Sequence, residues 1–163
     1  MERIIDVAQY IYDEYKRQSG EVIDDMKLHK LLYFVQRESL TITNAPMFNE
    51  EFEGWKCGPV SETVRRCYTR DGMYVEDARE ISAESAYIAK NIILQYGAMA
   101  SWKLSEISHK EISWRNSRKG LLEGANGNRP LALEDIRKDA EKVRRYDSAW
   151  DMFYDEFDEL GLI

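Results

Sequence analysis

The stretch that decides the fold runs from Lys27 to Val60, where a helical pattern passes into an aromatic, turn-rich segment. It begins with KLHKLLYF at residues 27–34, continues with APMF at residues 45–48 and ends with EGWKCGPV at residues 53–60. In the first part apolar side chains recur at helical spacing, which predicts an amphipathic helix over residues 25–40. The prolines and glycines of the later parts are turn residues, since they fix or free the backbone dihedral angles.

Apolar residues recur at helical spacing in several other parts of the chain. We expect further helices over residues 3–18, 59–68, 83–98, 101–108 and 132–145. The helix at residues 59–68 is expected to begin at Gly58-Pro59, because Pro is favoured in a first helical turn. Asp71-Gly72 should end that helical region, and residues 74–77 fit either a short strand or a loop. Residues 43–58 have no helical pattern, so we expect a short β-hairpin or an irregular aromatic loop there.

Composition restricts the class of protein. The chain has 163 residues, a formal net charge of -7 and 33% charged residues, which fits one compact globular domain. No segment approaches the roughly 20 apolar residues that span a bilayer, and the N-terminus lacks the pattern of a signal peptide. We therefore expect a cytoplasmic protein without a membrane partner. The acidic balance also argues against nucleic acid as a partner.

Residues 146–163 differ in character from the rest of the chain. Aromatic and apolar residues recur every three or four positions, acidic residues fill the gaps, and no Lys or Arg follows Arg145. This pattern predicts an acidic amphipathic helix with an aromatic face. We therefore divide the chain into a domain at residues 1–145 and a C-terminal extension at residues 146–163. The aromatic face either docks on the domain or binds a partner, and the sequence leaves both open.

The sequence contains no recognisable catalytic or metal-binding motif. The histidines, His29 and His109, have no ligands at the spacing that a metal site needs, and His29 is interpreted as making a surface hydrogen bond to Asp25. Cys57 and Cys67 are interpreted as reduced, partly buried thiols. A Cys57–His109 nucleophilic pair is an alternative that sequence alone does not test. We expect no enzyme activity, no metal and no cofactor.

Two aromatic groups have both a structural and a functional interpretation. Phe48, Phe52 and Trp55 fit a core beneath a long loop, or a contact surface, since aromatic residues carry much of the binding energy at interfaces. For His109, beside Trp114, we favour a structural role in which the imidazole satisfies a buried backbone group.

Four segments, taken together and in this order, resemble the Panacea domain family of SocA-like and phage-associated GepA-like antitoxins. They are KLLY at residues 30–33, PMF at residues 46–48, GWKCGPV at residues 54–60 and HKEISW at residues 109–114. The resemblance extends over residues 3–145. In the family pattern the position of Gly54 more often holds Ala.

The resemblance implies both a fold and a partner. We expect a mainly α, compact single domain of about five to seven helices, and Panacea domains look like small, mostly helical antitoxin modules. They occur beside very different toxins, including alarmone-synthetase-like ones that modify transfer RNA or nucleotides. By resemblance, this protein would bind and neutralise a cognate protein toxin encoded next to it. An alternative, from another family member, is a proteolytic adaptor that delivers the toxin to a cytosolic protease. Neither role needs catalytic residues.

The expected contact residues combine the extension with one residue of the aromatic loop. On the extension we expect Trp150, Phe153 and Phe157 to contact the toxin, with Asp151 and Asp155 facing its basic residues. In the domain we expect Trp55 to contribute. Regulation of its own promoter is a further alternative, although no basic recognition helix is evident. The sequence leaves homo-oligomerisation open.

Overall fold

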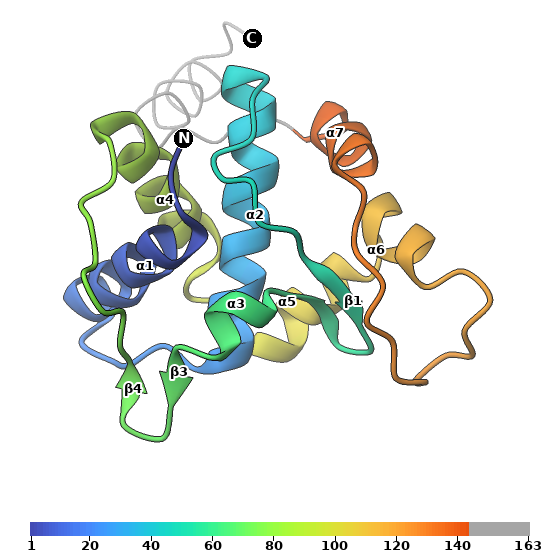
Figure 1. Ribbon diagram of the computed structural model, residues 1–163, viewed down its shortest axis with the longest axis horizontal. Coiled ribbons are helices and arrows are strands. Elements are labelled where there is room, and N and C mark those ends of the chain that lie inside the picture. Colours follow the sequence, from blue (N-terminus) through green and yellow to red (C-terminus); the bar gives the residue numbers. More distant parts are fainter. Residues whose placement is uncertain (144–163) are drawn as a thin grey trace, which may run out of the picture.

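Figure 1 shows the computed structural model, in which a long helix runs through the middle of the molecule. The structure describes residues 1–143, and within them the prediction of a mainly α, single compact domain with a short β-hairpin is confirmed. The helices are α1 (Ile4–Ser19), α2 (Asp25–Thr43), α3 (Glu62–Arg65), α4 (Ala83–Tyr96), α5 (Ser101–Ser108), α6 (Ile112–Ser117) and α7 (Leu133–Glu141). The strands are β1 (Glu53–Trp55), β2 (Gly58–Val60), β3 (Tyr68–Thr69) and β4 (Gly72–Met73). The predicted C-terminal helix lies outside the described residues.

Helix α2 is the central element, and it packs against α1, α4, α5, α7 and β2. Its N-terminus is capped by Asp24, whose carboxylate accepts a hydrogen bond from the Lys27 backbone N–H at 2.8 Å. Its C-terminus is Asn44, in the left-handed conformation at φ 60°. The helix is three residues longer than predicted. Every residue from Lys27 to Leu40 is buried, so neighbouring elements surround this helix on all sides.

The apolar core lies on both sides of α2. On one side α1 and α4 bury their apolar faces, and the Phe34 and Tyr96 rings stack with centroids 4.5 Å apart. On the other side Phe48 and Phe52 are almost completely buried and pack edge to face with each other. The core interpretation of Phe48 and Phe52 is therefore correct. None of the helices among residues 1–143 combines the length and apolar character needed to span a membrane.

Strands β1 and β2 form an antiparallel hairpin in which Glu53 pairs with Val60 and Trp55 pairs with Gly58. The prediction that a helix begins at Gly58-Pro59 is wrong, because these residues pair with β1 instead. Helix α3 begins only after Ser61, whose hydroxyl accepts a hydrogen bond from the Val64 backbone N–H. Pro59 is tolerated in β2 because β2 is the outer strand: the opposite side of β1 is bonded to residues 129–131.

Residues 68–73 form a second, shorter hairpin. Tyr68 pairs with Met73 and Thr69 pairs with Gly72, so Asp71-Gly72 belongs to a hairpin turn rather than to a helix end. Gly72 has φ +104°, a conformation that favours glycine. Residues 74–77 are not a strand. The structure differs from the sequence prediction at two further helices. Helix α6 occupies residues for which no helix was predicted, and α7 ends at Glu141 rather than at residue 145.

Candidate functional site: the hairpin face

Two segments that are distant in the sequence meet beside the first hairpin. Strands β1 and β2 carry the GWKCGPV segment, and the α5–α6 junction carries the HKEISW segment. The Trp114 indole N–H donates to the Trp55 carbonyl at 2.8 Å and joins the two. Gly58 lies so close to α5 that a Cβ placed on it would be 2.6 Å from the Ser108 hydroxyl. The fold therefore brings two of the family-like motifs into one site.

We call the solvent-facing part of this site the hairpin face, which consists of Trp55, Lys56, Arg65, His109 and Trp114. The Arg65 guanidinium lies 4.9 Å from the centre of the Trp55 ring. The His109 and Trp114 rings stack with centroids 4.1 Å apart and an interplanar angle of 10°. Lys56 and Arg65 are exposed, while the three ring side chains are partly buried. The face thus combines aromatic surface with positive charge.

Lys30 supports the hairpin from inside the protein. It lies on α2, its side chain is only 1% exposed, and its ammonium group donates to the Pro59 carbonyl at 3.2 Å. Burial lowers the pKa of Lys30 to about 8, because the charged form loses hydration. Its side chain also fills the space beside Gly58, where a Cβ would lie 2.6 Å from Cε. A buried lysine therefore fixes the hairpin to the central helix.

Arg118 fixes the other end of the hairpin. One guanidinium nitrogen donates to the Gly54 carbonyl at 3.0 Å, and a second donates to the Ala125 carbonyl. The same guanidinium lies 5.3 Å from the centre of the Trp114 ring. Trp114 therefore contacts His109 and Arg118, as well as the Trp55 carbonyl. This arrangement holds the hairpin face on a rigid base.

His29 holds the start of α3 near the hairpin. Its Nδ1 accepts a hydrogen bond from the Ser61 backbone N–H at 3.2 Å, and its Nε2 lies 3.0 Å from the Asp25 carboxylate. Hydrogen bonding to His29 lowers the pKa of Asp25. His29 is only 2% exposed, so the prediction that this hydrogen bond lies at the surface is wrong. The partner, Asp25, is the predicted one.

A buried polar network lies on the side of the α5–α6 junction facing α2. Arg37 donates to Glu111 at 2.8 Å, and the Tyr33 hydroxyl donates to Glu111 at 2.8 Å. Asp139 of α7 accepts hydrogen bonds from the backbone N–H groups of Ile112 and Ser113, so it caps α6. Burial raises the pKa of Glu111 and of Tyr33. Most of these polar atoms have internal partners, with the buried Nε of Arg37 as an exception, and such a network is typical of a structural role.

The sequence left open a nucleophilic pair of Cys57 and His109. Burial lowers the pKa of His109, although a hydrogen bond with the backbone of Cys57 acts in the opposite direction. That contact involves the backbone of Cys57, whereas nucleophilic catalysis needs the thiol beside the base. Cys57 is exposed, not partly buried as predicted, and both Cys57 and Cys67 are free thiols. Residues 1–143 hold no cluster of three or more metal-ligand side chains.

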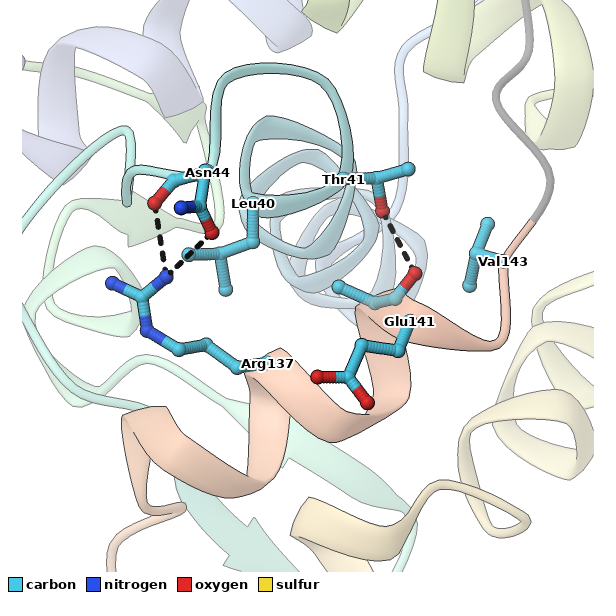
Figure 2. Close-up of a pocket in the computed structure, with 7 residues that line it drawn as sticks. Leu40, Thr41, Asn44, Arg137, Glu141 and Val143 are labelled. Carbon is cyan, nitrogen blue, oxygen red and sulfur yellow. Dashed lines mark hydrogen bonds between the residues drawn. The ribbon is translucent and has the colours of Figure 1, made fainter.

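A separate cleft lies between the C-terminus of α2 and α7, as Figure 2 shows. Its volume is about 400 Å³, and its lining includes Leu40, Thr41 and Val143. Arg137 reaches across it to the backbone and side-chain oxygens of Asn44, and Thr41 donates to the Ala140 carbonyl. Both contacts tie α7 to the end of α2. The described chain ends beside this cleft, at Val143.

The structure places one of the predicted contact residues in the site. Trp55 lies at the centre of the hairpin face, partly exposed, whereas Phe48 and Phe52 are in the core. The other predicted contact residues lie outside the described residues: Trp150, Phe153, Phe157, Asp151 and Asp155. The His109 imidazole interacts with the backbone of Cys57, which is an exposed residue, so its role in satisfying a buried backbone group stays a prediction.

Sequence reasoning missed Lys30, Arg118 and Asp139. Each is a charged residue in a helix or at a helix end, where the ordinary expectation is exposure to solvent. Lys30 falls within KLLY, one of the segments that carry the family resemblance, and this was the one feature of the sequence that could have pointed to its role.

Comparisons with known proteins agree with the shared motifs. The Panacea domain of SocA-like antitoxins matches residues 28–115, which include most of α2, both hairpins, α3, α4, α5 and most of α6. The chain is 42% identical over 50 residues to antitoxin SocA of Caulobacter vibrioides (strain NA1000 / CB15N). That alignment covers 31% of this chain and 27% of the relative. No solved structure matches. The chain belongs to the SocA-like Panacea domain family of antitoxins.

Proposed function

We propose that this protein is a cytoplasmic antitoxin that binds a protein toxin encoded next to it and neutralises the toxin by covering its active or substrate-binding surface. The observation that carries this proposal is the family match over residues 28–115, because that stretch contains the hairpin face and Lys30, which supports it. The similarity to antitoxin SocA points to the same class of activity.

The chemistry of the described residues favours binding over catalysis. Lys30, Glu111 and Tyr33 have shifted pKa values, which are often a sign of an active site. Each of these three groups, however, makes internal hydrogen bonds that hold helices or the hairpin in place. The residues at the surface beside them include Trp55, Trp114 and Arg65, and Trp and Arg are enriched at protein interfaces. We therefore assign no catalytic residue.

Two groups of residues would contact the toxin. The first is the hairpin face, with Trp55 at its centre. The second is the predicted aromatic face of the extension, Trp150, Phe153 and Phe157, with Asp151 and Asp155 opposite basic toxin residues. Two separate contact regions could cover a larger toxin surface than either alone, as stable complexes need.

The test is co-expression with the adjacent gene in a host that the adjacent gene product alone prevents from growing. We expect growth to be restored and the two proteins to co-purify as a stable complex. Replacing Trp150, Phe153 and Phe157 together by Ala should abolish rescue and leave the melting curve of the domain unchanged. Rescue by this triple variant would remove the extension from the interface.

Proteolytic delivery is distinguished by the host strain. Neutralisation by covering should persist in a strain without its cytosolic ATP-dependent proteases, with the toxin level unchanged. If rescue disappears in that strain, and the toxin is degraded only when both this protein and the protease are present, the adaptor function replaces the proposed mechanism.

A further inference from the structure

The hairpin face carries positive charge that takes no part in the ion pairs of residues 1–143. Lys56, Arg65 and Lys110 are exposed, and the ion pairs within residues 1–143 give none of the three an acidic partner. Lys110 directly follows His109 at the edge of the face. This local charge is unexpected in a chain with a net charge of -7.

Several acidic residues near the face already have partners within the protein. Glu53 accepts a hydrogen bond from the Trp55 indole N–H at 3.0 Å. Glu62 lies 3.7 Å from Arg66, and Glu106 lies 3.6 Å from Lys103. Glu111 is bonded to Arg37 inside the protein. Asp25 interacts electrostatically with Arg65, and the exposed Glu123 with His109. Lys56 and Lys110 are therefore the cationic side chains most available to an external partner.

The aromatic part of the face is rigid before any partner binds. Trp55 is held through its backbone by Trp114 and through its indole by Glu53, and its ring is covered on one side by Arg65. Lys30 and Arg118 hold the two strands from beneath. A surface whose side chains are already ordered loses little conformational entropy on binding. Trp and Arg are also the residue types that most often dominate interface energy.

From these observations we infer that the hairpin face binds an acidic segment of the toxin, with carboxylates meeting Lys56, Arg65 and Lys110 around an apolar contact at Trp55. This inference rests on the proposed function. A nucleic acid would also carry negative charge, but it usually needs a wider basic surface. The net charge of -7 repels an extended polyanion, whereas a short acidic segment can meet the face locally.

The test uses two charge-reversed variants of the full chain with equal net charge. The face variant is Lys56→Glu with Lys110→Glu. The matched control is Lys16→Glu with Lys90→Glu, which changes exposed lysines of α1 and α4, on the opposite side of α2 from the first hairpin (Figure 1). Both variants should keep the helical circular dichroism and melting temperature of the wild type, because all four side chains are exposed.

Affinity for the adjacent gene product is measured by calorimetry at 50 mM and 200 mM salt. We expect the face variant to bind at least tenfold more weakly than the wild type at the lower salt, and the control to stay within threefold. Raising the salt concentration should weaken binding by the wild type more than binding by the face variant. Trp55→Ala should also weaken binding at least tenfold, at both salt concentrations.

Other outcomes would contradict the proposed function, the inference or the class of partner. If the wild type neither binds nor rescues, the proposed function fails, and this inference fails with it. If the wild type binds but the face variant equals the control, the proposed function stands and the inference is wrong. If the wild type binds a single-stranded RNA oligonucleotide more tightly than the toxin, and the face variant loses that binding, the partner is nucleic acid.

Discussion

The two hairpins of this protein are held in different ways. Side chains from outside the first hairpin, β1–β2, bond to its backbone: Lys30 to Pro59, Trp114 to Trp55 and Arg118 to Gly54. The second hairpin, β3–β4, has only two residues in each strand. It is attached by the Tyr68 hydroxyl, which donates to the Ile23 carbonyl at 2.6 Å, and by an edge contact of Tyr68 with Tyr12.

This difference indicates which hairpin is built to present a surface. A hairpin of three-residue strands is weak by itself, so the stability of β1–β2 depends on the helices that hold it. Those contacts come from α2 and from the end of α6, which explains why two distant sequence motifs are needed for one surface. The β3–β4 hairpin has fewer outside contacts of this kind: Met73 is buried in the core, and Tyr68 contacts Ile23 and Tyr12. Substitutions in the first hairpin should therefore affect the whole domain, and those in the second should stay local.

The largest effect is expected for Gly58→Ala. Gly58 has φ +122°, and a Cβ there would lie 2.6 Å from both Lys30 Cε and Ser108 Oγ. Backbone strain and overpacking together should lower the free energy of unfolding by about 3 kcal/mol. The control is Gly120→Ala, where φ is +82° and nothing lies within 4 Å; strain alone should lower it by about 1 kcal/mol. Urea unfolding of both variants measures the difference, and equal losses would mean that Lys30 and Ser108 move aside freely.

The next largest effect is expected in how easily each hairpin opens locally. Amide protons of the first hairpin, such as Gly54 N–H bonded to the Arg129 carbonyl, should exchange only when much of the domain unfolds. The Tyr74 N–H, bonded to the Cys67 carbonyl beside the second hairpin, should exchange through a local opening. Hydrogen exchange followed by NMR should show a free energy of opening at least about 1.4 kcal/mol lower at Tyr74, a tenfold difference in rate. Similar rates at both sites would remove the distinction between the hairpins.

A smaller effect is expected in the pH dependence that Lys30 imposes. Burial lowers its pKa from 10.5 to about 8. Between those values the unfolded chain binds more protons than the folded one, so stability should rise with pH in this window. Lys30→Met lacks the titrating group. From pH 8 to pH 9, the stability of the wild type relative to Lys30→Met should increase by about 1 kcal/mol. Parallel stability curves would show that Lys30 is hydrated in the folded state.

The sequence predicted the helical framework because apolar spacing and capping residues are local signals. Helix α5 was predicted with its observed limits, and α2 began where Asp24 caps it. The Gly58-Pro59 pair was assigned to a helix start because Pro suits a first turn. That local preference was overridden by pairing with β1, where Pro59 occupies an outer strand and needs no N–H partner.

The candidate site was only partly predictable for a related reason. Trp55 was among the expected contact residues, but its support depends on side chains whose burial has no local signal. Lys30 lies on α2 among apolar residues, and it is buried because β2 covers it. Gly54 shows the same dependence: the family pattern more often has Ala there, yet a Cβ would lie 1.9 Å from the Ser117 hydroxyl. Such pairings appear only when distant segments are placed together.

The smallest effect is expected for Tyr68→Phe, which tests the attachment of the second hairpin. The substitution removes one hydrogen bond, from the Tyr68 hydroxyl to the Ile23 carbonyl, and keeps the aromatic ring against Tyr12. Because Tyr68 is partly exposed, water can replace the lost donor at the carbonyl, so unfolding free energy should fall by only about 0.5–1 kcal/mol. Urea unfolding measures this loss, with Tyr74→Phe as the control at an exposed tyrosine of the same region. A loss as large as that of Gly58→Ala would show that the second hairpin is as firmly integrated as the first, and that the Tyr68 hydroxyl supports the whole domain.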